Sequence, residues 1–135
     1  MATRHHSRSA VVSLLYAYDL GNKDINKFSE EILEEKKIRN KQKEFALALF
    51  NGVIENIESI DKLISSHLRK EWSFNRLGSI ERAILRLATF EVAYQKTDRA
   101  VVINEAVELT KEYASDQTPK FINGVLDAIS KDDEK

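Results

Sequence analysis

The chain contains very few of the residues that interrupt helices: one proline and four glycines among 135 residues. Apolar residues recur at three- and four-residue spacings along most of its length, which is the period of a helix face and not of a strand. The strand-like alternation at 100–103 is short and runs directly into a helical pattern. Because proline and glycine are the strongest local breakers of helices, we predict an all-α fold.

The apolar pattern divides the chain into six or seven helices. The predicted ranges are 7–20, 25–36, 41–69, 79–94 and 101–114, followed by a last helix with Thr118 as its N-cap and Pro119 at its first position. Phe28 and Tyr113 are assigned to inward helix faces. We expect one domain over residues 1–135, with an N-terminal bundle at about 7–69, a C-terminal bundle at about 79–131 and a charged tail at 131–135.

Composition excludes several classes of protein. The chain has no cysteine, which rules out disulfides, thiolate zinc sites and cysteine nucleophiles. No apolar run approaches the ~20 residues of a membrane-spanning helix, and the polar N-terminus does not have the pattern of a signal peptide. With 42% hydrophobic and 32% charged residues, we expect a globular cytoplasmic protein that does not contact a membrane.

The net charge is close to zero, with 21 Lys and Arg against 22 Asp and Glu. Such a chain is a poor non-specific binder of polyanions, because that affinity comes from many cationic contacts. The first 18 residues nevertheless carry Arg4 and Arg8 and no carboxylate. A small basic patch with a specific ligand is therefore allowed at the N-terminus.

No pattern of residues supports catalysis or metal binding. His5 and His6 form a tandem pair on an N-terminus that we expect to be mobile, and no histidine has a metal-ligating partner one helical turn away. Glu105, Glu108 and Glu112 have the spacing of a solvated helix face. The glycines do not form a phosphate-binding run. We predict no catalytic site, no metal and no cofactor.

Two aromatic residues are candidates for binding RNA. On an ideal helix, Tyr16 points about 160° away from the apolar face formed by Leu14 and Tyr18, so it could stack on a base while nearby arginines hold phosphates. Phe121 follows Lys120 in the first turn of the last helix, where free backbone N–H groups can meet an anion. From the residues alone, each aromatic side chain could equally pack against a neighbouring helix.

Four segments resemble the NusB family of transcription antitermination factors: RSAVVSLLYAYDL at 8–20, RLGSIERAILRLATFE at 76–91, VINEAVELTK at 102–111 and KFINGVLD at 120–127. They follow one another in the family's order and cover nearly the whole chain. The resemblance implies two three-helix bundles and no enzymatic activity. It also implies pairing with NusE, a ribosomal protein of the small subunit, and binding to boxA RNA. Together the two proteins would help RNA polymerase read through terminators in ribosomal RNA operons.

The same resemblance supplies candidate contact residues. The family's arginine-rich N-terminus, first-helix tyrosine and Lys-Phe motif are associated with RNA. On this chain they correspond to an RNA-binding set of five residues: Arg4, Arg8, Tyr16, Lys120 and Phe121. The surface that faces NusE lies in the C-terminal half, and Glu81 is the position carried over for it.

Two departures from the family pattern affect the expected RNA binding. His5 and His6 stand where arginines are common, so RNA affinity should depend on pH. Gln117 stands where an acidic residue is common, so repulsion of phosphate should be lower. The alternative to an RNA-binding protein is a self-associating helical scaffold, a homodimer, whose signature would be outward apolar residues such as Val12 and Phe90.

Overall fold

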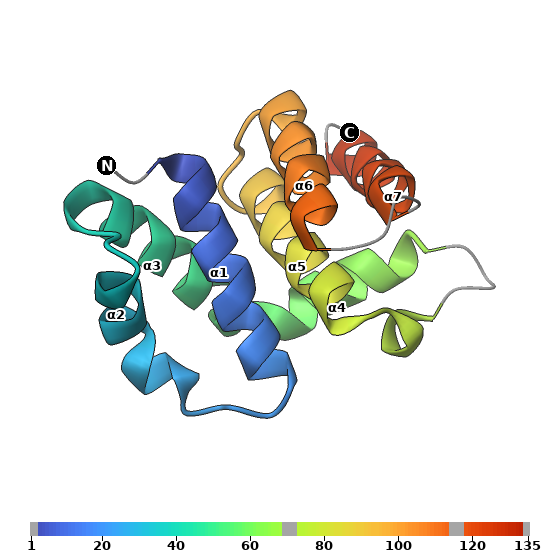
Figure 1. The fold of residues 1–135 in the computed structure, drawn as a ribbon. Helices are drawn as coiled ribbons and strands as arrows, with labels where there is room; N and C mark the ends of the chain where they lie inside the picture. The colour runs from blue at the N-terminus through green and yellow to red at the C-terminus, as the bar shows by residue number, and fades with distance from the viewer. Residues whose placement is uncertain (1–2, 69–72, 114–117, 134–135) are drawn as a thin grey trace.

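The all-α fold is confirmed by the computed structural model, which describes residues 3–68, 73–113 and 118–133. Figure 1 shows α1, α2 and α3 on one side of the molecule and α6 and α7 on the other, with α5 between them. The elements are α1 (Arg4–Asp19), α2 (Ile25–Glu35), α3 (Asn40–Glu55), α4 (Ile57–Ser66), the short 3-10 turn η1 (Phe74–Arg76), α5 (Ser79–Ala93), α6 (Arg99–Tyr113) and α7 (Thr118–Asp133).

Helix α1 begins three residues earlier than the sequence predicted. The hydroxyl of Thr3 accepts a hydrogen bond of 3.1 Å from the backbone N–H of His6, which caps the helix at Thr3. Both His5 and His6 therefore lie in the first turn of the helix and not on an irregular segment before it. The helix ends as predicted, where Gly21 adopts a φ of 106° that other residues rarely tolerate.

The long helix predicted over 41–69 is two helices. Asn56 interrupts it with φ −115° and ψ 18°, and its side-chain amide donates a 2.8 Å hydrogen bond to the carbonyl of Gly52. This bond satisfies a carbonyl at the end of α3. The apolar spacing continues through the break, which is why periodicity alone did not reveal it. As a result α4 turns away and packs on α5 and α7.

Helix α5 forms the centre of the molecule. Its residues from Ala83 to Val92 are all buried, and it contacts α1, α3, α4, α6 and α7. A helix that is buried on all sides must be covered by other helices on all sides, and its charged residues Arg86 and Glu91 are paired with residues of those helices. The N-terminal helices and the C-terminal helices therefore both pack against α5, and together they form one continuous hydrophobic core.

The apolar residues that would have marked a self-associating scaffold are inside this core. Val12 is fully buried, and Phe90 is 7% exposed. The ring of Phe90 lies against Gly52, where a Cβ atom would collide with it, so glycine permits α3 and α5 to approach closely. The expectation that Val12 and Phe90 point outward is wrong.

A network of charged side chains joins α1 to the C-terminal helices. Arg82 and Arg86 of α5 both bind the carboxylate of Asp19 at the end of α1, at 2.6 and 2.9 Å. Arg86 also binds Asp61 of α4 at 2.8 Å, and the guanidinium lies 5.3 Å from the ring centre of Phe74. Burial alone would raise the pKa of Asp19, but hydrogen bonds from Arg82, Ser79 and Arg86 lower it below its ordinary value.

Candidate nucleic-acid interface

Tyr16 points outward, as its position on an ideal helix predicts. Its neighbours Leu14 and Leu15 are buried, whereas Tyr16 is 37% exposed. The buried residues of α1 face α3 and α5. The tyrosine ring is therefore held on a rigid helix with one side open to solvent, which is the arrangement required for stacking on an unpaired base.

Arg4 is exposed at the start of the same helix. Its guanidinium lies over the ring of Phe45 from α3, 4.6 Å from the ring centre. This cation–π contact orients the side chain without neutralising it. Arg4 and Tyr16 are separated by twelve residues of helix, roughly 18 Å of rise. The cation and the aromatic ring are thus at opposite ends of α1.

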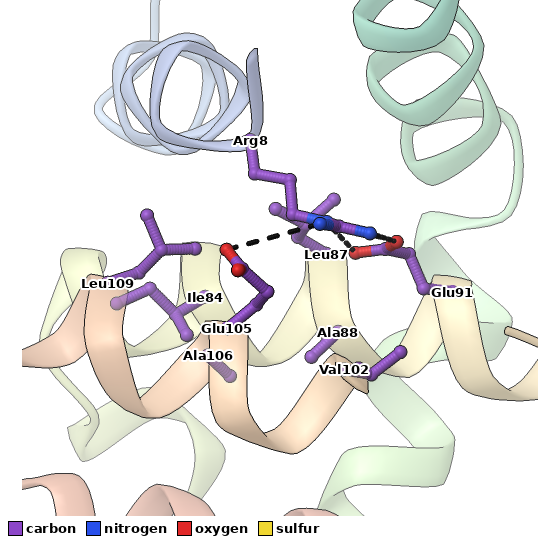
Figure 2. Close-up of a pocket in the computed structure, with 9 residues that line it drawn as sticks. All are labelled: Arg8, Ile84, Leu87, Ala88, Glu91, Val102, Glu105, Ala106 and Leu109. Carbon is purple, nitrogen blue, oxygen red and sulfur yellow. Dashed lines mark hydrogen bonds and ion pairs between the residues drawn. The ribbon is translucent and has the colours of Figure 1, made fainter. Parts of the chain in front are cut away.

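Arg8 is not an exposed phosphate ligand, and the structure corrects that expectation. Its side chain is 5% exposed and forms a two-pronged ion pair with Glu91 of α5, which is 2% exposed. Nη2 and Nε of Arg8 donate to Glu91 oxygens at 2.7 and 3.0 Å, while Nη1 lies 4.0 Å from Glu105. Figure 2 shows the guanidinium between these two carboxylates. The physical reason is that a buried carboxylate needs a cation, and Arg8 supplies it.

A cavity of about 10 Å³ lies beside this ion pair, between α1, α5 and α6 (Figure 2). Apart from Arg8, Glu91 and Glu105, its lining is aliphatic: Ile84, Leu87, Ala88, Val102, Ala106 and Leu109. That volume has space for roughly one water molecule. The cavity is therefore part of the packing around a buried ion pair, too small for a nucleotide or cofactor.

His5 lies between two carboxylates of α6. Its Nδ1 is 2.7 Å from Glu105 and its Nε2 is 2.5 Å from Glu112. Hydrogen bonds to Glu105 and Glu112, in that order of importance, raise the pKa of His5 above its ordinary value. Glu105 and Glu112 are thus not simply a solvated face, as the sequence suggested, because His5 binds both.

The N-terminus of α7 carries Lys120 and Phe121. Helix α7 begins at Thr118, one residue earlier than predicted. Lys120 is exposed, and Phe121 is half-buried and packs against the core. Phe121 therefore closes part of the core edge, and its stacking on RNA stays a prediction. Gln117, the departure from the family pattern, lies outside the described residues.

Glu81 lies in the first turn of α5 and is partly buried. A carboxylate in this position interacts favourably with the positive end of the helix dipole. A Cβ atom at Gly78, the N-cap residue, would collide with the Glu81 carboxylate. The Glu81 side chain therefore folds back over the start of α5. This position is in the C-terminal half of the chain, where we expect the surface that faces NusE.

Tyr113 is a residue that sequence reasoning misplaced. It was assigned to the inward face of its helix, but it is 39% exposed. The hydroxyls of Tyr113 and Ser9 share a hydrogen bond of 2.6 Å. The two residues are 104 positions apart, and no local sequence signal links them. Phe28 was likewise assigned inward and is 49% exposed.

Neither a metal site nor a membrane span is present in the part of the chain that the structure describes. No group of three or more His, Asp or Glu side chains there could hold a metal ion. The two carboxylates at His5 occupy opposite ring nitrogens and do not converge on one point. Within the same described ranges, no helix has the length and apolar character needed to cross a bilayer.

Comparison with known proteins gives consistent results over almost the full chain. The NusB family model matches residues 5–131. Transcription antitermination protein NusB of Sulfurimonas denitrificans is 66% identical over 132 residues, covering 98% of this chain and 99% of that protein. The protein of the same name from Wolinella succinogenes is 61% identical, covering 98% of this chain and 97% of its own length.

Two solved structures have the same fold. NusB of T. maritima superposes with a TM-score of 0.88 at 40% identity, covering 96% of this chain and 92% of that one. A chain from a crystal structure of the antitermination factors NusB and NusE in complex with double-stranded RNA gives a TM-score of 0.86 at 37% identity, covering 96% of both chains. The chain therefore belongs to the NusB family of transcription antitermination factors, and it is not an enzyme.

Proposed function

We propose that this protein pairs with NusE and binds boxA RNA, and that the pair supports read-through by RNA polymerase in ribosomal RNA operons. A factor that acts on nascent bacterial RNA works in the cytoplasm, and this is the proposed location. The RNA surface consists of Arg4, Tyr16, Lys120 and Phe121. The single observation that supports it most strongly is the partly exposed side chain of Tyr16, whose neighbours Leu14 and Leu15 are buried and hold α1 in the core.

The remaining residues of this surface supply complementary chemistry. Arg4 and Lys120 are exposed cations that can contact phosphates. Phe121 has a partly exposed ring anchored by the core, so a base can stack on it with little loss of side-chain freedom. Arg8 acts by positioning: its ion pair with Glu91 fixes α1, which carries Tyr16, against α5.

A protein partner is expected because the chain offers few phosphate contacts. The proposed RNA surface has two exposed cations, Arg4 and Lys120, which cannot supply the affinity of a typical nucleic-acid complex, because that affinity depends on many released counterions. The related NusB structure contains NusE together with RNA. We propose that NusE adds the missing contact surface, and that Glu81 at the start of α5 lies on the surface that NusE binds.

The test is fluorescence anisotropy with a labelled boxA-type RNA, titrated with this protein alone and with equimolar NusE. A scrambled RNA of the same length is the control. We expect selective binding that strengthens with NusE and weakens about 10-fold or more in Tyr16→Ala, because stacking on an aromatic ring contributes about 1–3 kcal/mol per base. Phe28→Ala provides a matched control, since Phe28 is an exposed aromatic residue on α2.

The two parts of the proposal can be separated. Glu81→Lys should weaken the NusE complex and leave binding of RNA by this protein alone unchanged. Equal affinity for boxA and scrambled RNA, with and without NusE, would contradict the RNA assignment. In that case, measurement of the oligomeric state by light scattering would test the alternative, that the protein is a self-associating scaffold.

A further inference from the structure

Tyr113 is an exposed aromatic residue whose position the core does not explain. It is the last residue of α6, and 39% of it is exposed. Its polar end is fixed on a different helix, because its hydroxyl shares a 2.6 Å hydrogen bond with Ser9 of α1. The ring is thus held at both ends, by the backbone of α6 and by the hydroxyl of Ser9, while one side faces solvent.

Ser9 lies on the same face of α1 as Tyr16. At 100° per residue, Ser9, Ser13 and Tyr16 fall within about 60° of one another around the helix axis. Ser9 and Tyr16 are separated by two helical turns, about 10 Å of rise. Tyr16 of α1 and the hydroxyl of Tyr113 from α6 therefore lie at two ends of one face of α1, on which Ser9 and Ser13 are partly exposed and Tyr16 is exposed.

His5 binds two of the carboxylates close to this face of α1. Glu112 precedes Tyr113 and would repel a phosphate, but its carboxylate binds Nε2 of His5. Glu105, the second carboxylate at His5, also lies 4.0 Å from Arg8. Lys111 binds Glu108 at 3.4 Å. Arg4, the first residue of α1, is an exposed cation five positions before Ser9. Each acidic side chain of α6 near the tyrosine thus has a partner, with Glu105 and Glu112 sharing the ring of His5.

We propose that Tyr113 is a third stacking residue of the RNA surface, beside Tyr16 and Phe121, and that Ser9 orients its ring. This inference rests on the proposed function and extends the RNA surface from α1 and α7 to the end of α6. An aromatic side chain that is already held in place stacks on an unpaired base with little loss of conformational freedom. Rings that accept two or three successive bases are a common means of binding single-stranded RNA.

The experiment compares Tyr113→Ala, Tyr113→Phe and Ser9→Ala in the full chain with equimolar NusE and boxA-type RNA. We expect affinity to fall about 10-fold in Tyr113→Ala, since each stacked base contributes about that factor. Tyr113→Phe and Ser9→Ala should lose only about 2- to 3-fold, because the ring is kept and only its anchoring hydrogen bond is removed. Tyr94→Ala is the matched control, because Tyr94 is 41% exposed but stacks on Phe90 at the end of α5.

A second measurement separates stacking from a general effect on the fold. The same RNA carrying 2-aminopurine in place of one adenine at a time should show fluorescence quenching with the wild-type protein and loss of quenching at one position with Tyr113→Ala. Thermal melts should show that this variant is folded. If Tyr113→Ala binds and quenches as the wild type does while Tyr16→Ala is weakened, the inference is overturned and the proposed function stands. If the wild-type protein shows no selective RNA binding, both are overturned.

Discussion

Arg8 and Glu91 form an ion pair almost completely hidden from solvent, in which two guanidinium nitrogens of α1 donate to the carboxylate of α5 at 2.7–3.2 Å. Pairs of this geometry hold their partners in a fixed register. Removing one member is costly, because the other charge is then buried without compensation. Arg8 therefore fixes α1 against α5, although it belongs to the N-terminal basic segment, and its guanidinium is not exposed to a ligand.

Replacement of Glu91 by glutamine should destabilise the protein strongly. The substitution keeps the size of the side chain but leaves the guanidinium of Arg8 without its buried countercharge, and we expect the free energy of unfolding to fall by about 3 kcal/mol. Urea denaturation followed by circular dichroism measures this change. The double variant Arg8→Met with Glu91→Leu should recover most of the loss, since an apolar pair removes both buried charges. Unchanged stability in Glu91→Gln would show that Arg8 finds sufficient compensation from Glu105.

Asp19 should contribute to the loss of stability of the folded protein at acidic pH. Its pKa is lowered in the folded protein from the ordinary value of 3.8 by its arginine partners. The stabilisation is therefore present above that ordinary value and is lost as pH falls through the lower, folded value. We expect Asp19→Asn to cost about 3 kcal/mol near neutral pH and to flatten the decline in stability on acidification. Urea titrations at a series of pH values measure the free energy of unfolding of the wild type and of Asp19→Asn. If the two plots of this free energy against pH are parallel, Asp19 does not have this role.

Gly52 should tolerate no side chain, whereas Gly124 should. A Cβ atom at Gly52 collides with the ring of Phe90, so Gly52→Ala forces α3 and α5 apart and should cost about 1–3 kcal/mol. Gly124, in α7, has open space around the corresponding position. Gly124→Ala should therefore leave stability unchanged or raise it by up to about 1 kcal/mol, because alanine favours helix. Melting temperatures of the two variants provide the comparison, and an equal response would contradict the packing explanation.

The parts of the fold that follow from local chemistry were predictable. Apolar spacing identified the helices, and the glycine at position 21 marked the end of the first one correctly. Helix geometry placed Tyr16 opposite the apolar face but left open whether another helix covers it, and the structure leaves it 37% exposed while Val12, on the same side, is buried. The break at Asn56 was missed because the apolar spacing runs through it, and a side-chain hydrogen bond to the carbonyl of Gly52 is what ends α3.

What could not be predicted depends on residues distant in sequence. Arg8 and Glu91 are 83 positions apart, and His5 and Glu112 are 107 apart. A charged residue near a terminus is ordinarily solvated, so sequence alone favoured an exposed Arg8. Only the packing of α1 against α5 and α6 brings the countercharges within reach, and the same packing attaches Tyr113 to Ser9.

His5 should make both stability and RNA binding depend on pH in the same direction. Glu105 and Glu112 raise its pKa above the ordinary value of 6.5. The stabilisation from the protonated ring is therefore fully present below that value and is lost as pH rises through the higher, folded value. Over the same range Glu112 loses its cation and becomes an unpaired negative charge next to Tyr113. We expect RNA affinity to rise between about pH 8 and about pH 6 at fixed salt.

Two observations check this prediction. The ring proton signals of His5 in NMR spectra should titrate above the ordinary value, and this upward shift should shrink in Glu105→Gln and Glu112→Gln. The increase in RNA affinity on lowering the pH should be smaller in His5→Gln, which keeps a hydrogen-bonding side chain but cannot gain a charge. His6→Gln is the matched control, since His6 lies 3.3 Å from the carbonyl of Lys36 and has no carboxylate partner among the described contacts. If His6→Gln abolishes the pH dependence of RNA affinity and His5→Gln does not, protonation of His5 is not its cause, and the prediction is wrong.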